Sequence, residues 1–342
     1  MFFREVSMDI IIKRAILHIL DFQSNMTVIS NQWLDLSDPI MLDFVVKHVE
    51  NSFKDSGRHR GEFQPQSRFS QMVHQYLNNE LDLISLSSTA ATMLHDEIIQ
   101  SDSLDSVDVM MVELSRGEEQ YLGLLCFQNK MGYTHQVFSS EDGVRNEIMR
   151  HYSILPNTSQ KLSSYAFIKL SDLKVSFADK KRNINGEQVY ALPEKVLQCT
   201  WERSSRETVR MVNKIANKVA EEHGANSTVA VSRAKSYIAE NAETSDVLSP
   251  MDMGREVFAE SSVMQNEFRV QLQEAGLDRP LPVDRPYAQK AGRSHKIKTD
   301  TGIEITIPVD YFDNERYVEF INNPDGTLSI ALKNIAKITN RQ

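Results

Sequence analysis

The chain has 342 residues, of which 38 are basic and 47 acidic, and its formal net charge is −9 at pH 7. This length exceeds one hydrophobic core, so we expect two or three domains, and the acidic balance argues against a small basic protein that coats nucleic acid with its whole surface. The two cysteines, Cys126 and Cys199, form no C-x-x-C pair, which argues against a disulfide framework or zinc site and fits a reducing cytoplasm. Lys13 and Arg14 interrupt the apolar N-terminal run, and no stretch approaches the roughly 20 apolar residues that span a bilayer, so we expect a cytosolic protein.

The fold expected is α+β, and its first part is a mixed α/β domain at 1–192 with an antiparallel-rich sheet. It begins with a hairpin made by 9–20 and 26–30. Capping and periodicity predict helices at 38–53, 68–77 and 81–100, with the basic segment GRHRGEFQPQS as a loop between the first two. Alternating, β-branched or aromatic residues predict strands at 107–114, 120–128, 133–139, 165–170 and 174–178.

A short basic run follows the last of these strands, consisting of Lys180, Lys181 and Arg182. Asn185-Gly186 comes next and is a tight-turn dipeptide, so the run should lie on a hairpin. A basic hairpin is a candidate phosphate contact. More often such a hairpin is simply an exposed turn that keeps an edge strand soluble.

The second part is a helical segment at 193–278, and the third is a small C-terminal antiparallel β-sheet within 279–342. Helices are expected at 201–224, 227–241, 250–258 and 262–275. A proline-punctuated linker at 279–286 leads to HKIKTDTGIEITIPVDYF, which alternates polar and apolar residues around a turn at Thr301-Gly302. VEFINN and LSIALKNI then flank the turn signal Pro324-Asp325-Gly326. A sheet this small should pack against the helices or a partner.

The helix expected at 201–224 carries a row of cations at steps of three or four residues: Arg203, Arg206, Arg210, Lys214 and Lys218. That spacing places all five on one face, while Val209, Val212 and Val219 fall on the other. A polyanion with evenly spaced charges, such as nucleic acid, suits this row. An ordinary solvated polar face has the same pattern, and Glu207 and Glu221 dilute the charge.

No catalytic, cofactor-binding or metal-binding residue is predicted. The glycines form no phosphate loop, and neither H-E-x-x-H nor G-x-S-x-G occurs. The histidines are scattered without metal-ligand spacing. Nuclease chemistry would require carboxylates such as Glu118 and Glu141 to converge on a cation, and nothing in the sequence brings them together. We therefore expect a protein that is not an enzyme and needs no cofactor.

Three blocks resemble the bacterial nucleoid-associated protein family called NdpA-like or YejK-like. They are KRAILHILD, LGLLCFQNKMGYTH and the closing HKIKTDTGIEITIPVDYF with VEFINNPDGTLSIALKNI. They lie in the same order as in that family, and the resemblance covers most of the chain from Met8 onward. It implies a non-enzymatic nucleoid protein of the cytoplasm that binds nucleic acid as a homodimer. It supplies no functional residues.

The resulting hypothesis is binding of double-stranded DNA through phosphate contacts with little sequence specificity. The predicted contact residues are the cationic row, the basic hairpin and a C-terminal group, namely Arg203, Arg206, Arg210, Lys214, Lys218, Lys180, Lys181, Arg182, Arg293, Lys296 and Lys298. One alternative is a protein-interaction module recruited to DNA by a DNA-processing partner, with the acidic stretch 96–119 or the C-terminal strands as its surface. Another is binding of RNA or single strands, with Tyr287 near Arg285 and Lys290, or Trp201 beside Arg203, as stacking groups.

Overall fold

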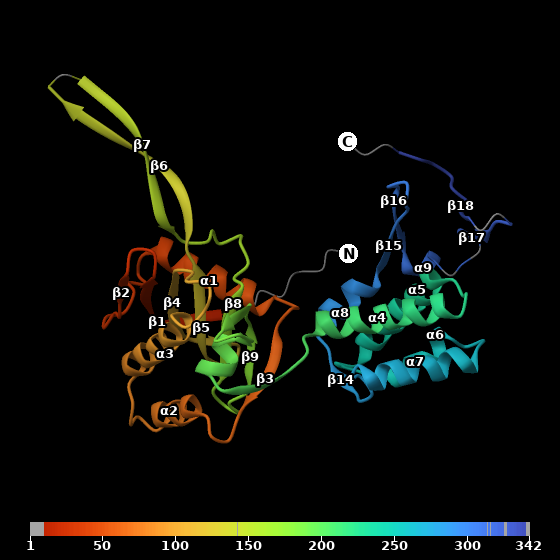
Figure 1. Ribbon diagram of the computed structural model, residues 1–342, viewed down its shortest axis with the longest axis horizontal. Helices are drawn as coiled ribbons and strands as arrows, with labels where there is room; N and C mark the ends of the chain where they lie inside the picture. Colours follow the sequence, from red (N-terminus) through yellow and green to blue (C-terminus); the bar gives the residue numbers. More distant parts are fainter. Residues whose placement is uncertain (1–9, 142, 313, 315, 325–326, 340–342) are drawn as a thin grey trace. The chain divides into compact units, whose positions relative to one another are not determined.

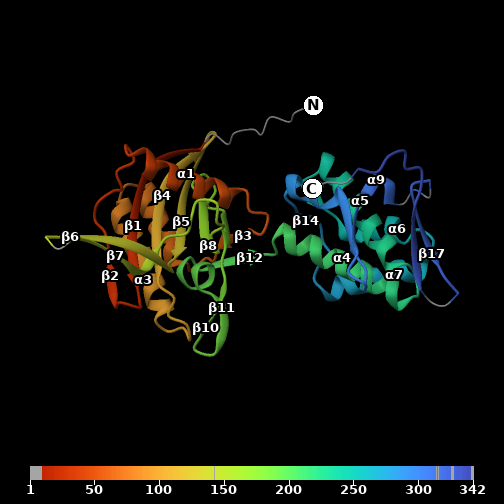
Figure 2. The ribbon, with the colours of Figure 1, turned by 90° about the horizontal axis from the view of Figure 1, so that it is seen from above.

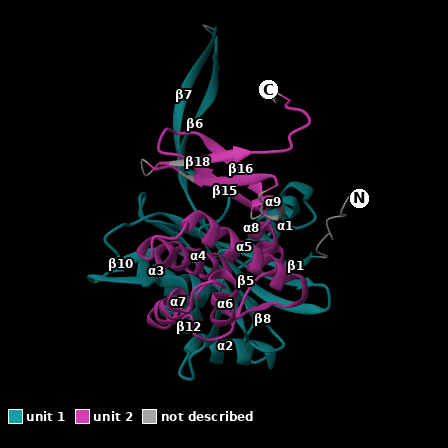
Figure 3. Cartoon of the chain, turned by 90° about the vertical axis from the view of Figure 1, so that its right-hand side faces the viewer, with its two compact units in different colours: residues 1–202 teal, residues 203–342 magenta. Residues whose placement is uncertain are grey.

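The computed structural model describes residues 10–141, 143–312, 314, 316–324 and 327–339. The chain forms two compact units, residues 1–202 and residues 203–342, shown in different colours in Figure 3. The first unit ends ten residues after the first of the three expected parts. The second unit contains most of the expected helical segment and all of the expected C-terminal part. The division between these two parts therefore stays a prediction.

An eight-stranded antiparallel sheet forms the first unit, and it confirms the α+β class. The strand order is β12-β3-β9-β8-β5-β4-β1-β2. In chain order these strands are β1 (Ile10–Asp21), β2 (Met26–Val28), β3 (His59–Phe63), β4 (Val107–Arg116), β5 (Glu119–Gln128), β8 (Ser164–Lys169), β9 (Val175–Ala178) and β12 (Cys199–Glu202). The predicted hairpin of β1 and β2 and the predicted strands at β4, β5, β8 and β9 are confirmed.

Helices cover both faces of this sheet. The side chains of a strand alternate between its faces, so a strand that is apolar throughout needs a cover on each side. α2 (Arg68–Leu77), α3 (Leu83–Ile98) and the π-helical turn η1 (Ala191–Val196) share a core with one face, where Met111 and Leu124 lie. α1 (Pro39–Phe53) packs on the other face with Val112 and Phe127. β4 and β5 are therefore apolar on both sides. The three helices confirm the predicted ones, and α1 has Asp38 as its N-cap.

Two strands of this sheet contradict the prediction. The expected loop at 57–67 contains β3, and residues 199–202, partly assigned to the start of a helix, form β12, which pairs with β3. Gly61 explains why the pairing is possible, since a Cβ at this position would lie 2.4 Å from the carbonyl oxygen of Thr200. The segment reads as a loop because its glycine and charges give no β signal. Pairing with strands distant in sequence makes it a strand.

Two hairpins of the first unit lie outside the eight-stranded sheet. β6 (Lys130–Ser140) and β7 (Gly143–Ile154) form a long hairpin that leaves the sheet, as Figure 1 shows, and β7 was not predicted. β10 (Lys181–Ile184) and β11 (Glu187–Tyr190) form the predicted basic hairpin. Its turn residues Asn185 and Gly186 have φ angles of 53° and 86°, as a tight hairpin turn requires.

The second unit has a helical core and C-terminal hairpins. Its helices are α4 (Ser205–Glu222), α5 (Ser227–Thr244), α6 (Pro250–Val257), α7 (Ser262–Glu274) and α8 (Arg285–Gly292), which lie together in Figure 2. The first four confirm the predicted helices apart from the start of α4. α8 was expected to be linker in its first residues; Asp284 caps it by accepting from the amide of Tyr287. Val212, Phe268 and Leu272 are buried between the helices.

Short strands complete the second unit. β13 (Val247–Leu248) pairs with β14 (Leu281–Pro282). β15 (Ser294–Lys298) pairs with β16 (Glu304–Pro308), and after α9 (Val309–Phe312) β17 (Val318–Asn322) pairs with β18 (Leu328–Leu332). The C-terminal antiparallel strands are thus confirmed, as two hairpins. Of the predicted turn at 324–326, residues 325 and 326 lie outside the described residues.

Candidate nucleic-acid interface

Helix α4 contains four of the five residues predicted for the cationic row. α4 begins at Ser205, because Ser204 and Glu207 form a capping box in which each side chain bonds the other's backbone amide. Arg203 therefore precedes the helix, and its Nη1 donates to the carbonyl oxygen of Gly276 at 3.5 Å. The prediction that Arg203 lies on the helical face is wrong. The S-x-x-E spacing of the capping box was present in the sequence and would have excluded it.

The remaining four residues, Arg206, Arg210, Lys214 and Lys218, are exposed, and we call them the α4 row. They follow one another at every fourth position, so the row rises about 6 Å per step and about 18 Å in total. The opposite face of α4 is buried in the core of the second unit through Val209, Val212 and other residues. The helix is therefore anchored on one side and presents cations on the other.

The carboxylates near the α4 row leave its centre uncovered. Among the described residues, no ion pair involves Arg210 or Lys214. Lys218 lies 3.6 Å from Glu222, but both side chains are about half exposed, and such pairs contribute little. The carboxylate of Glu207 is engaged at the N-cap, where it accepts from the amide of Ser204 at 3.0 Å. The carboxylate keeps its negative charge there, so the dilution expected from Glu207 remains at the first turn of α4.

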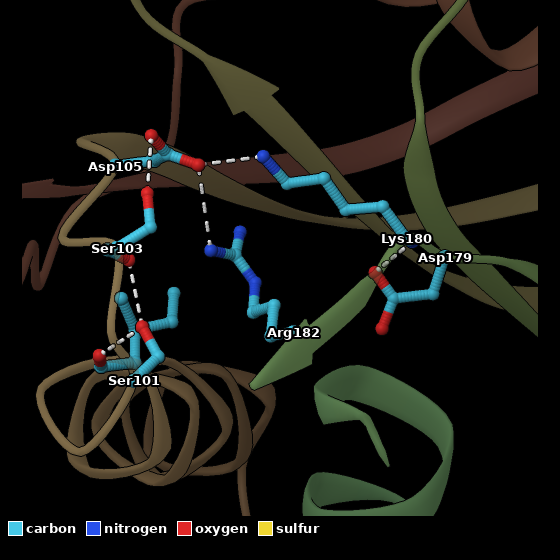
Figure 4. Close-up of polar contacts among 7 residues, drawn as sticks. Ser101, Ser103, Asp105, Asp179, Lys180 and Arg182 are labelled. Carbon is cyan, nitrogen blue, oxygen red and sulfur yellow. Dashed lines mark hydrogen bonds and ion pairs between the residues drawn. The ribbon is translucent and has the colours of Figure 1, made fainter. Parts of the chain in front are cut away.

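The basic hairpin is arranged differently, as Figure 4 shows. Lys180 Nζ lies 2.6 Å from Asp105 Oδ2, and Arg182 Nη1 lies 3.6 Å from the same oxygen. The Arg182 side chain is only 9% exposed. Burial opposes ionisation of Asp105, but the hydrogen bond from Lys180 and the two cations keep its pKa below the ordinary value. Two of the three cations thus neutralise a carboxylate of their own unit. Lys181 is exposed, and its Nζ lies 5.5 Å from the centroid of the Tyr190 ring.

The acidic stretch 96–119 does not form one continuous acidic surface. Asp105 binds the basic hairpin, and Glu113 lies within 2.5 Å of Arg14 and 3.5 Å of Lys13. Asp108 is buried, which raises its pKa, and its carboxylate accepts from the Asn129 amide at 3.1 Å. Several acids that were expected to face a basic partner are therefore used inside the first unit.

The C-terminal basic residues Arg293, Lys296 and Lys298 are exposed after α8. Lys298 lies 3.3 Å from Glu304 across the β15–β16 hairpin, and both side chains face solvent. The residues proposed for stacking are more enclosed. Tyr287 is half-buried, and Arg285 donates to the carbonyl oxygens of Ala242 and Glu243 at the end of α5. Arg285 therefore has a structural role.

The two units share the charge of the chain unequally. Residues 1–202 contain 19 basic and 27 acidic side chains, whereas residues 203–342 contain 19 basic and 20 acidic ones. Almost all of the acidic excess thus belongs to the first unit. The α4 row stands on the nearly neutral second unit, where repulsion of a polyanion is smaller.

Two further features concern only the described residues. None of their helices combines the length and apolar character needed to cross a membrane. No group of three or more histidine, cysteine, aspartate or glutamate side chains among them is arranged to hold a metal ion.

Comparison with known proteins places the chain in a family. The family model described as "Nucleoid-associated protein YejK" matches residues 16–339, which includes nearly all of both units. No curated protein matches the chain. Proteins of this family are nucleoid-associated and generally non-enzymatic. The resemblance of the three sequence blocks is thereby confirmed, and the chain belongs to the YejK family of nucleoid-associated proteins.

Proposed function

We propose that this protein binds double-stranded DNA through phosphate contacts made by the α4 row. The observation that carries the proposal is the exposure of Arg206, Arg210, Lys214 and Lys218 on one face of a helix whose other face is anchored in a core. Membership of a nucleoid-associated family supports nucleic acid as the polyanion. We also propose that the protein is located in the nucleoid, within the cytoplasm, and acts without enzymatic chemistry.

The spacing of the row fits a duplex. Double-stranded DNA carries one charge per about 1.7 Å of its axis, so the 18 Å or so covered by the row faces about ten phosphates. Long, flexible side chains at four positions can each reach one of them. Contacts of this kind fix the position of the protein but carry no sequence information. The function proposed is therefore binding with little base specificity.

The contact set is narrower than the sequence predicted. We retain the α4 row as its centre, with Lys181, Arg293, Lys296 and Lys298 as exposed additions. We leave out Lys180 and Arg182, because they are held by Asp105, and Arg203, because it lies off the helical face. Adding phosphate contacts at Lys180 or Arg182 would require breaking an existing ion pair.

We further propose that the protein is a homodimer, as family resemblance implies. A two-fold axis would present two α4 rows to one duplex and roughly double the number of phosphates neutralised.

Titration of fluorescent duplexes of unrelated sequence tests the proposal. With four contacts, the log of affinity should fall with log salt at a slope of about −3.6, which is about a 150-fold loss between 50 and 200 mM salt. All sequences should bind alike, and a single strand of the same length should bind more weakly. An affinity that does not respond to salt would refute the phosphate mechanism. Duplex degraded in the presence of magnesium would refute the non-enzymatic part.

A further inference from the structure

The β6–β7 hairpin is an arm without a partner in the part of the chain that the structure describes. Its two strands pair with each other over ten levels, and Figure 1 shows them running away from the eight-stranded sheet. From Tyr133 to Ser140 every side chain is exposed. An isolated two-stranded hairpin is at best marginally stable in water, so a partner surface would contribute to its order.

The two faces of the arm differ in character. One face carries the paired residues Tyr133/Arg150, His135/Ile148, Val137/Asn146 and Ser139/Val144, and we call it the apolar face. Its four large apolar side chains are strongly exposed: Tyr133 by 64%, Val137 by 55%, Val144 by 70% and Ile148 by 81%. An unbroken row of this kind on a projecting hairpin is typical of a protein-contact surface.

The opposite face of the arm is satisfied by its own side chains. The guanidinium of Arg145 lies over the ring of Phe138, 5.8 Å from its centroid, and its Nη2 lies 2.6 Å from a carboxylate oxygen of Glu147. Phe138 and Met149 on this face are also less exposed, at 38% and 43%. The apolar face has a similar contact at one end, where the guanidinium of Arg150 lies 5.9 Å from the centroid of the Tyr133 ring. Its other large side chains, Val137, Val144 and Ile148, remain 55%, 70% and 81% exposed, and these are the ones that a partner would cover.

The charges of the arm indicate what that partner is. Its three basic residues, Lys130, Arg145 and Arg150, are balanced by three acidic ones, Glu141, Asp142 and Glu147. The arm as a whole carries no net charge, so it lacks the excess of cations by which proteins attract phosphate, and its apolar face favours a protein partner. The charges are also ordered along the arm. Lys130 and Arg150 lie toward the sheet, while Glu141 lies at the tip.

We propose that the arms of two copies of this chain pack antiparallel through their apolar faces. Glu141 at the tip of one arm then approaches Arg150 and Lys130 near the sheet of the other copy. A parallel arrangement would bring Glu141 beside Glu141 and Arg150 beside Arg150, and like charges side by side are destabilising. A two-fold interface uses the same surface on both copies, so that surface must be complementary to itself, as the arm is in the antiparallel orientation. This inference rests on the homodimer proposed above and identifies its surface.

The contact area of the arm sets the expected affinity of the dimer. Ten residues at about 3.3 Å each give a length of about 33 Å, and a ribbon roughly 10 Å wide then offers roughly 330 Å² of plan area. A standard interface buries about 800 Å² of each partner, so pairing of the arms predicts a dimer that dissociates on dilution. The experiment must therefore cover a wide range of concentration.

Sedimentation equilibrium of the full chain over that range tests the proposal. The variant Val137→Thr with Ile148→Thr removes apolar contact but keeps branched side chains suited to strands. The matched control, Phe138→Thr with Met149→Thr, makes the same kind of change on the opposite face. We expect the wild type and the control to dimerise, and the apolar-face variant to show a dissociation constant raised by about 100-fold or more. A wild type that stays monomeric, or two variants that behave alike, would overturn the proposal.

Cross-linking provides a second test that does not depend on how the threonine variants fold. In the antiparallel arrangement position 133 of one arm lies over position 139 of the other, whereas a parallel arrangement places 139 over 144. Cys126 and Cys199 are buried, so only an introduced thiol is accessible. A mixture of Tyr133→Cys and Ser139→Cys proteins should be joined by a short bis-maleimide, and a mixture of Ser139→Cys and Val144→Cys should not. The reverse result would refute the orientation.

Measuring duplex binding on the same samples separates this inference from the proposed function. A monomer that binds DNA would refute the pairing of the arms and leave DNA binding intact. A wild type that is a dimer, an apolar-face variant that is a monomer, and no DNA binding by either would support the pairing of the arms and refute the DNA proposal.

Discussion

Neutralising the centre of the α4 row gives the sharpest test of its role. The change is Arg210→Gln with Lys214→Gln, at two exposed positions for which no ion pair is found among the described residues. Glutamine is nearly as good a helix former as arginine or lysine, so α4 should remain intact. Exposed substitutions of this kind usually change the free energy of unfolding by less than about 0.5 kcal/mol. A loss of binding can therefore be assigned to the lost charge.

The release of counterions from DNA gives the size of the expected loss of affinity. Each phosphate contact makes affinity vary as salt concentration to the power of about −0.9, which at 0.15 M is worth a factor of about five relative to 1 M salt. Two lost contacts should therefore lower affinity about 30-fold for one protomer, and the salt slope should become shallower by about 1.8. If both rows of a dimer engage one duplex, the two effects on the logarithm double.

The assay is anisotropy of a labelled duplex about 30 base pairs long, titrated at several salt concentrations. The matched control is Lys47→Gln with Lys174→Gln, which removes the same charge from two exposed positions of the first unit. Loss of affinity in the α4 variant together with near-unchanged binding of the control is the expected result. Equal affinity in both variants, or an equal loss, would refute a localised α4 site. A lower affinity with an unchanged salt slope would refute the phosphate contact itself.

Other predictions concern stability and reactivity. Gly292→Ala should lower the free energy of unfolding by about 1–3 kcal/mol, because its Cβ would lie 2.5 Å from a backbone oxygen of α5, and an unchanged urea midpoint would contradict this. Burial lowers the pKa of His18 and of His295 to about 4. Because the unfolded chain takes up these protons near pH 6.5, stability should fall between pH 6.5 and 4, by up to about 3 kcal/mol for each group. Urea midpoints measured across this range should show the fall, and His18→Asn should make it smaller. Burial raises the pKa of the Cys126 and Cys199 thiols to about 12, so a thiol reagent should label neither in the native protein and both after denaturation.

The candidate site was partly accessible from sequence because helical periodicity is local. Steps of four residues place side chains on one face wherever the helix packs, so the α4 row could be predicted with its buried face. The basic hairpin was predictable as a hairpin from Asn185-Gly186. That Lys180 and Arg182 bind Asp105 was not predictable, because the partners are separated by 75 residues or more and only the fold brings them together.

Some strands could not be predicted from the sequence, because they too depend on partners distant in the chain. β3 and β12 have weak β signals, and each becomes a strand by pairing with the other and, for β3, with β9. β7 lacks the apolar core positions that mark a buried strand, since it lies in the arm and not in the sheet.

By itself the sequence determined the helices, most of the central strands and the family, because caps, turns and periodicities act over a few residues. Only the tertiary structure decided which basic side chains are exposed on a helix face, as in the α4 row, and which are held by carboxylates, as Lys180 and Arg182 are. It also decided which apolar side chains are left without a core. Both depend on burial and on contacts between distant segments, and no local pattern contains them.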